Sequence, residues 1–247
     1  METGHRGVWV VVGVALAAAA GSNVAQSSPT PQCHGHQQTT RSSWGDDTIR
    51  GTSGRDVIAA RGGDDVVYAG RGRDLICGHA GDDLIFDGGG RDRVWGGRGR
   101  DRLEQRYIGG GNSLDGGRGR DVLSYATART GVVALLADGE ADAACSGPAS
   151  RGGCLAVWDP DFLADLEAVA GSSYRDTIVG DGGDNSLRGR GGPDTLRGRE
   201  GDDRIHGRRG RDLLNGGRGR DDLRGGADRD RCRNGERYRS CERRDRD

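Results

Sequence analysis

The sequence predicts an all-β solenoid of short stacked strands, and three observations lead to this fold class. A nine-residue pattern recurs along most of the chain, each copy contributes one aliphatic residue, and the composition is unsuited to an ordinary globular core. Among 247 residues, 48 are glycine and only 4% are aromatic, so little apolar surface is available for burial. Repeats that bury one residue each are stable only when neighbouring copies stack, as they do in a solenoid.

The repeat has the pattern G-x-x-G-x-D-x-U-x, in which U is aliphatic. Seven units follow one another from Ser42 to Glu104, two more come after a two-residue slip, and seven others extend from Gly171 to Arg233. The glycine-rich half of each unit favours a turn, and its last three residues favour a very short strand. Because neighbouring side chains of a strand point to opposite faces, U is expected to lie inward and its two neighbours outward.

The residue before each aspartate has a second period. It alternates between aspartate and arginine from Asp46 to Arg91, so the true period is eighteen residues and each coil contains two units. Successive turns then lie on opposite edges of a flattened, two-sheet roll, which we call the GDD edge and the GRD edge. In the first array the GDD edge carries Asp47, Asp65, Asp83 and Asp101, and the GRD edge carries Asp56, Asp74 and Asp92.

A column of carboxylates about 5 Å apart is repulsive unless a cation lies between consecutive turns. Ca²⁺ meets that need, because it accepts about six to eight oxygen ligands from carboxylates and backbone carbonyls, and glycine-rich turns let carbonyls converge. The candidate metal ligands are the aspartates of the repeat: Asp47, Asp56, Asp65, Asp74, Asp83, Asp92, Asp101, Asp121, Asp176, Asp194, Asp203, Asp212, Asp221 and Asp230.

These units resemble the RTX family, the haemolysin-type calcium-binding nonapeptide repeats GGxGxDxUx. The resemblance is carried by GHAGDDLIF at 78–86, GGRGRDRLE at 96–104 and GGRGRDDLR at 216–224. It implies a right-handed parallel β-roll with one Ca²⁺ between turns eighteen residues apart, and up to about ten ions in all. Segments 121–141 and 162–187 look like the longer coils that interrupt such arrays. The implied ligand pairs, completed by carbonyls of the glycine turns, are Asp47/Asp65, Asp65/Asp83, Asp83/Asp101, Asp56/Asp74 and Asp74/Asp92.

Arginine beside many of the aspartates separates this chain from the strongly acidic members of that family. All 37 basic residues are arginine, and with 38 acidic residues the formal net charge is −1. An arginine on a turn can pair with a neighbouring carboxylate and partly replace the ion, although exposed pairs contribute only about 0 to 1 kcal/mol. We therefore expect the GDD edge to bind calcium more tightly than the GRD edge.

Residues 1–25 are expected to form a secretory signal peptide. The apolar run from Gly7 to Ala20 is 14 residues long, which is short for a spanning helix, and small residues follow it. We therefore expect a secreted, extracellular or cell-surface protein with no membrane span after cleavage. The remaining segments are a cap at 26–41, the first array at 42–124, an insert of longer coils or loop at 125–170, the second array at 171–233, and a cap with an arginine-rich tail at 234–247.

Six cysteines in a secreted chain predict a disulfide framework, whose connectivity the sequence leaves open. Position in the repeat favours the pairs Cys232–Cys241, Cys145–Cys154 and Cys33–Cys77. The first pair falls in the aliphatic column and would close the C-terminal end, the second brackets a loop of the insert, and the third would fasten the N-terminal segment over the roll. Free thiols or thiolate metal sites are disfavoured because the sequence contains no C-x₂-C motif.

The function expected from these features is calcium binding with a structural or cell-surface role, in a monomer without a catalytic domain. The chain has no lysine, which excludes a P-loop and a Schiff base, and it has neither an HExxH nor a GxSxG motif. One alternative is an adhesion or ligand-binding solenoid that contacts a cell-surface polymer through its arginine-rich tail. Interleaved aspartates and scarce aromatics argue against nucleic acid as the partner. A weaker alternative is a hydrolase that uses acids of the insert: Asp159, Asp161, Asp165 and Glu167.

Overall fold

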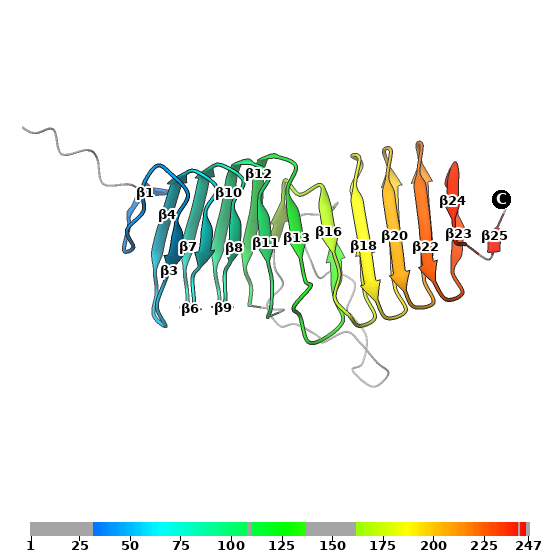
Figure 1. The fold of residues 1–247 in the computed structure, drawn as a ribbon, viewed down its shortest axis with the longest axis horizontal. Helices are drawn as coiled ribbons and strands as arrows, with labels where there is room; N and C mark the ends of the chain where they lie inside the picture. Colours follow the sequence, from blue (N-terminus) through cyan, green and yellow to red (C-terminus); the bar gives the residue numbers. More distant parts are fainter. Residues whose placement is uncertain (1–31, 108–109, 137–161, 242, 246–247) are drawn as a thin grey trace, which may run out of the picture. The chain divides into compact units, whose positions relative to one another are not determined.

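The structure is a computed structural model that describes residues 32–107, 110–136, 162–241 and 243–245. In this part of the chain the secondary structure consists of β-strands joined by turns, without a helix. No helix capable of crossing a membrane therefore occurs among the described residues. The strands belong to one compact unit, Pro31–Asp247, in which each strand lies beside its equivalent in the next coil (Figure 1).

One face of the roll is a continuous parallel sheet of ten strands. In spatial order these are β3 (Thr48–Arg50), β5 (Val66–Tyr68), β8 (Leu84–Phe86), β11 (Arg102–Glu104), β13 (Val122–Ser124), β16 (Ala168–Ala170), β18 (Ser186–Gly191), β20 (Arg204–Arg209), β22 (Asp222–Ala227) and β24 (Arg237–Arg239). The turns that precede the strands of this sheet form the GDD edge in both arrays.

The opposite face is divided into two parallel sheets. The first has five strands: β4 (Val57–Gly62), β7 (Leu75–Ala80), β10 (Arg93–Gly99), β12 (Ser113–Gly119) and β15 (Phe162–Ala164). The second has six: β14 (Val133–Leu135), β17 (Thr177–Val179), β19 (Thr195–Glu200), β21 (Leu213–Arg218), β23 (Arg231–Arg233) and β25 (Arg243–Asp245). Two small pairs complete the strands: an antiparallel hairpin of β1 (Gln32–Cys33) and β2 (His36–Gln37), and β6 (Arg71–Gly72) with β9 (Gly89–Gly90).

The strand register confirms that each coil contains two nonapeptides. Ile49 pairs with Val67, and Val67 with Ile85, so the partners are eighteen residues apart. At the two-residue slip the sequence separation between paired residues becomes twenty, as in the pairing of Leu103 with Leu123. The strands on both sides of the slip keep their inward residues in line, so the turn between them absorbs the two extra residues.

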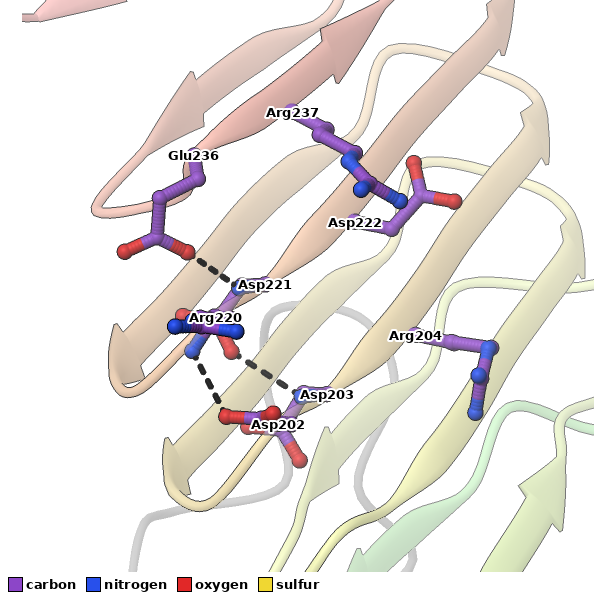
Figure 2. Close-up of a pocket in the computed structure, with 8 residues that line it drawn as sticks. All are labelled: Asp202, Asp203, Arg204, Arg220, Asp221, Asp222, Glu236 and Arg237. Atoms are coloured by element: carbon purple, nitrogen blue, oxygen red, sulfur yellow. Dashed lines mark hydrogen bonds between the residues drawn. The ribbon is translucent and has the colours of Figure 1, made fainter.

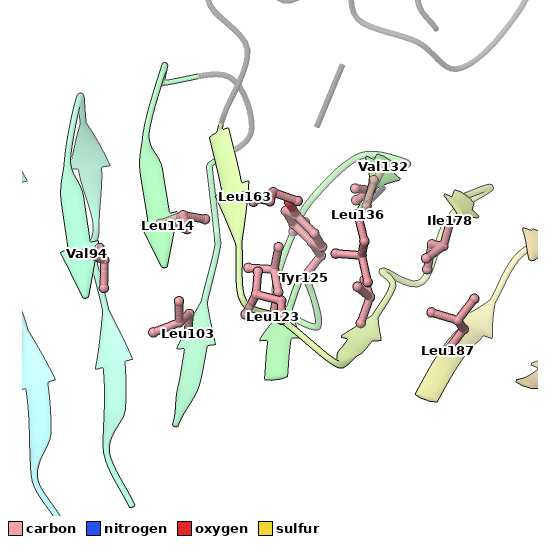
Figure 3. Packing of buried hydrophobic residues seen from close by; sticks show 14 of the residues in the cluster. Val94, Leu103, Leu114, Leu123, Tyr125, Val132, Leu136, Leu163, Ile178 and Leu187 are labelled. Atoms are coloured by element: carbon pink, nitrogen blue, oxygen red, sulfur yellow. The ribbon is translucent and has the colours of Figure 1, made fainter. Parts of the chain in front are cut away.

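The core is a single column of aliphatic side chains enclosed between the two faces. Ile58, Val67 and Ile76 are fully buried, as are the equivalent residues of the second array, such as Leu196. Figure 3 shows this column where the two arrays meet. Burial of one such side chain contributes roughly 1.5 to 3 kcal/mol, so the core depends on many coils rather than on a few large contacts.

The insert changes the order of the strands. β14 pairs forward with β17, whereas β15, which follows it in the chain, pairs back with β12. This exchange accounts for the division of the second face into two sheets. Tyr125, Val132 and Leu136 join the core at this point, so larger side chains fill the junction between the arrays (Figure 3).

The N-terminal segment covers part of the outer surface of the five-stranded sheet. Cys33 packs in a second apolar cluster with Val57, Ala59, Leu75 and Cys77, all of which flank inward positions of β4 and β7. These four residues lie on the outward face of the sheet, as expected for flanking positions, and they are buried because the β1–β2 hairpin lies over them. Residues 39–42 also close the edge of this sheet through hydrogen bonds to β4.

The disulfides Cys33–Cys77 and Cys232–Cys241 are both present, which confirms these two predicted pairs. Cys145 and Cys154 lie outside the described residues. One detail of the prediction is corrected: Leu223 pairs with Tyr238, so Tyr238, and not Cys241, occupies the inward position of the last coil on the ten-stranded face. The C-terminal end is closed by this tyrosine together with the neighbouring disulfide.

Candidate metal centres

Two columns of buried aspartates follow the edges of the roll, one aspartate at the end of each glycine turn. In both columns, Oδ1 of an aspartate accepts the backbone N–H of the equivalent residue one coil earlier. Asp83 accepts from Asp65 at 2.9 Å, and Asp74 accepts from Asp56 at 2.8 Å. The same bond links Asp212 to Asp194 in the second array at 2.9 Å. We call this arrangement the inner ladder, and it confirms the predicted stacking of aspartates eighteen residues apart.

Two glutamates extend the inner ladder where the nonapeptide pattern is interrupted. Glu167 Oε2 accepts the N–H of Asp121 at 2.7 Å, and Glu236 Oε2 accepts the N–H of Asp221 at the same distance. Sequence reasoning missed the ladder role of both residues, because the spacing to the preceding aspartate differs from eighteen at each place. Glu167 thus has a structural partner in the ladder, whereas Asp159 and Asp161 of the hydrolase alternative lie outside the described residues.

The second carboxylate oxygen of most ladder aspartates is buried and accepts no hydrogen bond. Such an oxygen is expensive to bury, because it has lost water without gaining a donor. A cation is the partner that would satisfy it. The aspartates with this open Oδ2 are Asp65, Asp74, Asp83, Asp92, Asp101, Asp121, Asp194, Asp203, Asp212 and Asp221.

Glycine is required beside seven of these open oxygens, those of Asp83, Asp101, Asp121, Asp194, Asp203, Asp212 and Asp221. A Cβ at Gly78 would collide with Asp83 Oδ2 and with the carbonyl oxygen of Gly96 in the next coil. Gly198 has the same relation to Asp203 Oδ2 and to the carbonyl of Gly216. The open carboxylate oxygen and a backbone carbonyl of the adjacent coil therefore approach the same space, and both are hard oxygen donors of the kind that Ca²⁺ prefers.

Burial raises the pKa values of most ladder aspartates. The pKa of Asp83 is raised to about 7 and that of Asp194 to about 8, first by desolvation and then by neighbouring carboxylates, against the lowering effect of the ladder hydrogen bond. The pKa of Asp203 is also raised to about 7 for the same reasons. A divalent cation would reverse these shifts by stabilising the ionised form.

The carboxylates of Asp47, Asp56 and Asp176 are satisfied by hydrogen bonds without a cation. Asp47 Oδ2 accepts hydrogen bonds from the backbone and hydroxyl of Ser43 at 2.6 and 2.9 Å, which lower its pKa. Thr52 makes the equivalent bonds to Asp56 at 2.6 and 2.9 Å. Asp176 accepts the Ser172 hydroxyl at 2.8 Å and the Ser172 N–H at 2.7 Å. In each of these turns a serine or threonine four residues before the aspartate satisfies its carboxylate.

Side-chain amides occupy the corresponding space at the two-residue slip. Asn112 replaces the ladder aspartate there and accepts the N–H of Asp92 at 2.9 Å. Its amide nitrogen donates to Asp87 at 3.3 Å and to Gln105 at 3.2 Å, and Gln105 also donates to Asp87. Because amide N–H groups cannot coordinate a cation, this turn is closed by a polar side-chain network.

The GDD edge has an additional outer ladder, formed by the aspartates that precede the inner ladder. On the GRD edge of the first array, arginine occupies the corresponding positions. Asp46 Oδ1 accepts from the N–H of Asp64 one coil later, which is the opposite direction to the inner ladder. In the second array Asp202 accepts in the same way from Arg220 at 2.9 Å. Figure 2 shows the two ladders side by side, with the outer bond between Asp202 and Arg220 and the inner bonds from Asp203 to Asp221 and from Asp221 to Glu236. The GDD edge therefore concentrates more carboxylate oxygens than the GRD edge.

Carboxylates alone do not complete a coordination sphere. No group of three or more histidine, cysteine, aspartate or glutamate side chains suited to a metal occurs in the part of the chain that the structure describes. Backbone carbonyls of the glycine turns would have to supply most of the ligands. Three ion pairs, Arg102–Glu104, Arg218–Glu200 and Arg224–Asp222, join neighbours on the strand faces and involve no ladder aspartate.

Comparison with known proteins agrees with this geometry. The chain matches the model of the RTX calcium-binding nonapeptide repeat at residues 42–76, 78–103, 167–196 and 197–232, which together span just over half of its length. No curated protein matches the chain. Among solved structures, it is similar to the solution structure of the AlgE6R3 subunit from the Azotobacter vinelandii mannuronan C5-epimerase, with 28% identity over 38% of this chain and 55% of that chain and a TM-score of 0.20. Because the matched stretches lie in both arrays of stacked coils, the chain belongs to the family of RTX calcium-binding nonapeptide repeat proteins.

Proposed function

We propose that the protein is a secreted structural module with a role at the cell surface, and that calcium ions between its turns stabilise the β-roll. The observation that carries this proposal is the open Oδ2 of the buried ladder aspartates, of which Asp83 is typical. A buried carboxylate without a partner is strongly destabilising, and a hard divalent cation shared between two coils removes that cost. The disulfide Cys33–Cys77 supports secretion, because such bonds form and persist in oxidising compartments.

The strongest sites are assigned to consecutive rungs that both have an open Oδ2. There, Ca²⁺ would accept one oxygen from each aspartate and several carbonyl oxygens from the glycine turns. These pairs are Asp65/Asp83, Asp83/Asp101, Asp101/Asp121, Asp74/Asp92, Asp194/Asp212 and Asp203/Asp221. The turns of Asp47, Asp56 and Asp176 are assigned weaker sites, because serine or threonine already satisfies their carboxylates.

Two adjacent aspartates provide a matched test. Both aspartates have one buried oxygen without a hydrogen bond, but Asp221 lies in the inner ladder, whereas Asp222 lies on the outer strand face, where Arg224 pairs with its Oδ2 at 2.8 Å and lowers its pKa. Calorimetric titration with calcium should show fewer bound ions or weaker binding for Asp221→Asn and unchanged binding for Asp222→Asn. Equal titrations for the wild type and both variants would contradict the assignment of calcium to the inner ladder.

Secretion has a separate test. Expression of the full chain with its N-terminal segment should release a protein that begins after the apolar run, as N-terminal sequencing of the medium would show. Retention of the intact chain inside the cell would contradict the secreted role while leaving calcium binding untouched.

A further inference from the structure

The arginines of the GRD edge line a groove on the first array. The groove has a volume of about 680 Å³, and its walls include Arg55, Arg73, Arg91 and Arg93 together with His36 and Trp95. This volume lies within the range of sites that bind small molecules or short polymer segments. The only acidic residue in its lining is Asp74. The groove thus gathers four guanidinium groups in a chain whose overall charge is close to zero.

Three of these arginines form a regular column. Arg55, Arg73 and Arg91 precede the ladder aspartates of three successive coils, so their backbones are about 4.8 Å apart, the spacing of neighbouring strands. All three side chains are exposed, and Nε of Arg91 donates to the carbonyl of Gly111 at 3.2 Å. Arg93 extends the column onto the outer face of β10. The column repeats a positive charge along the axis on which the coils stack.

The guanidinium groups of Arg55, Arg73 and Arg93 are not neutralised by the ladder. The side chain of Asp74 is buried, with 1% of its surface exposed, and its Oδ1 accepts the N–H of Asp56. Its charge therefore faces the turn and not the solvent. Among the described residues, Arg55, Arg73 and Arg93 take part in no ion pair. Calcium bound between the turns would make the potential of the groove more positive still.

One wall of the groove is covalently fixed. The β1–β2 hairpin carries His36 and is anchored by the Cys33–Cys77 disulfide. The ring of His34 lies against Trp95, with their centroids 3.7 Å apart. The hairpin is therefore held over β7 and β10 before any ligand arrives, which lowers the entropy that binding must overcome.

We propose that this groove binds an acidic polysaccharide, a glycan that carries a carboxylate or sulfate on successive sugar residues. A column of equally spaced guanidinium groups matches a polymer with repeating charge better than a single small anion. Arginine suits such groups because its planar fork donates two hydrogen bonds to one carboxylate or sulfate. Single-stranded nucleic acid fits less well, because the groove offers only Trp95 for stacking and His34 already lies against that ring.

The test compares the oxidised protein with a triple variant, Arg55→Gln, Arg73→Gln and Arg93→Gln, in calcium-containing buffer. The matched control removes three exposed arginines of the second array, Arg188→Gln, Arg197→Gln and Arg204→Gln, and so changes the net charge equally. The probes are a short oligogalacturonate, a heparin oligosaccharide and an oligo-dT of similar length, and circular dichroism checks that each variant retains its fold.

We expect at least one glycan probe to bind the wild type, and its affinity to fall about tenfold or more in the groove variant but little in the control, since three charge-assisted contacts of about 0.5 kcal/mol each amount to that factor. Carboxylated and sulfated ligands are distinguished by which glycan binds more tightly. Equal losses in the two variants, no glycan binding, or preference for oligo-dT would each overturn the proposal. None of these outcomes depends on where calcium binds. Failure of the glycan proposal can therefore be distinguished from failure of the calcium assignment.

Discussion

Replacement of Asp83 by asparagine should change the stability of the roll in opposite directions with and without calcium. Asp83 Oδ1 accepts the N–H of Asp65, and the amide oxygen of asparagine can keep this bond. Oδ2 is buried and open, beside the carbonyl of Gly96, which can accept from the new amide nitrogen. Asp83→Asn therefore removes a buried charge without removing a rung of the ladder.

The magnitude follows from the pKa of this carboxyl, which burial raises from 3.8 to about 7. Since each pKa unit corresponds to about 1.4 kcal/mol, ionised Asp83 costs the calcium-free fold on the order of 4 kcal/mol at pH 7.5. The variant should regain part of that free energy in chelator. With calcium bound, the same substitution removes one ligand, so the free energy of unfolding should fall, by about 1 to 3 kcal/mol.

Urea unfolding followed by circular dichroism measures the change in the free energy of unfolding. The measurement is made once in excess chelator and once in excess calcium. Where the calcium-free wild type is already unfolded, stabilisation is seen as a gain of β signal in the variant. Asp222→Asn serves as the control, because this residue lies outside the ladder, and it should shift neither condition by more than about 0.5 kcal/mol. Destabilisation of Asp83→Asn by the same amount with and without calcium would refute the argument that the ladder carboxylates are calcium ligands.

Three further outcomes are expected. Because the folded pKa values of Asp83 and Asp194 are raised to about 7 and about 8, the calcium-free fold binds protons more tightly than the unfolded chain. Its melting temperature should therefore fall as the pH rises from about 4 to about 8, and a flat profile would be inconsistent with this cause. Gly78→Ala should weaken calcium binding by obstructing the space beside the ladder, while Gly182→Ala, where a Cβ meets no atom within 4 Å, should have no such effect in the same titration. Replacing Cys33 and Cys77 by serine should lower the free energy of unfolding by about 4 kcal/mol for a separation of 44 residues, and an unchanged urea midpoint would show that the hairpin contributes little to stability.

The stacking of the coils could be predicted from the sequence, because each unit has one aliphatic residue and one aspartate at a constant spacing. A register that is not a multiple of nine residues would place glycine against aliphatic side chains, and the observed pairing of Ile49 with Val67 has the eighteen-residue spacing that the alternating residue before each aspartate predicts. The alternation of aspartate and arginine before the ladder position then distinguishes the two edges. Cys33–Cys77 and Cys232–Cys241 were predictable for a related reason, since the coil geometry leaves few partners within reach.

Whether the second oxygen of each ladder carboxylate accepts a hydrogen bond could not be predicted in the same way. It depends on whether a hydroxyl lies four residues before the aspartate, as Ser43 and Thr52 do, and the repeat pattern treats that position as variable. The glutamate rungs at Glu167 and Glu236 escaped notice because a longer side chain compensates there for an irregular spacing. The exchange of β14 and β15 is a non-local pairing, and no local signal in the insert specifies which earlier or later strand each one joins.

Stabilisation of the β-roll by calcium can be measured by far-UV circular dichroism of the oxidised protein, residues 26–247. The titration extends from chelator to about 10 mM calcium, a range that covers the affinities of extracellular calcium modules. Magnesium at the same concentrations is the control, because its preference for octahedral geometry and bound water suits these turns poorly. We expect calcium to increase the β signal and magnesium to leave it unchanged. A spectrum that is fully β-rich in chelator at neutral pH and does not change with calcium would contradict this expectation, because the open carboxylates would then be tolerated without a cation.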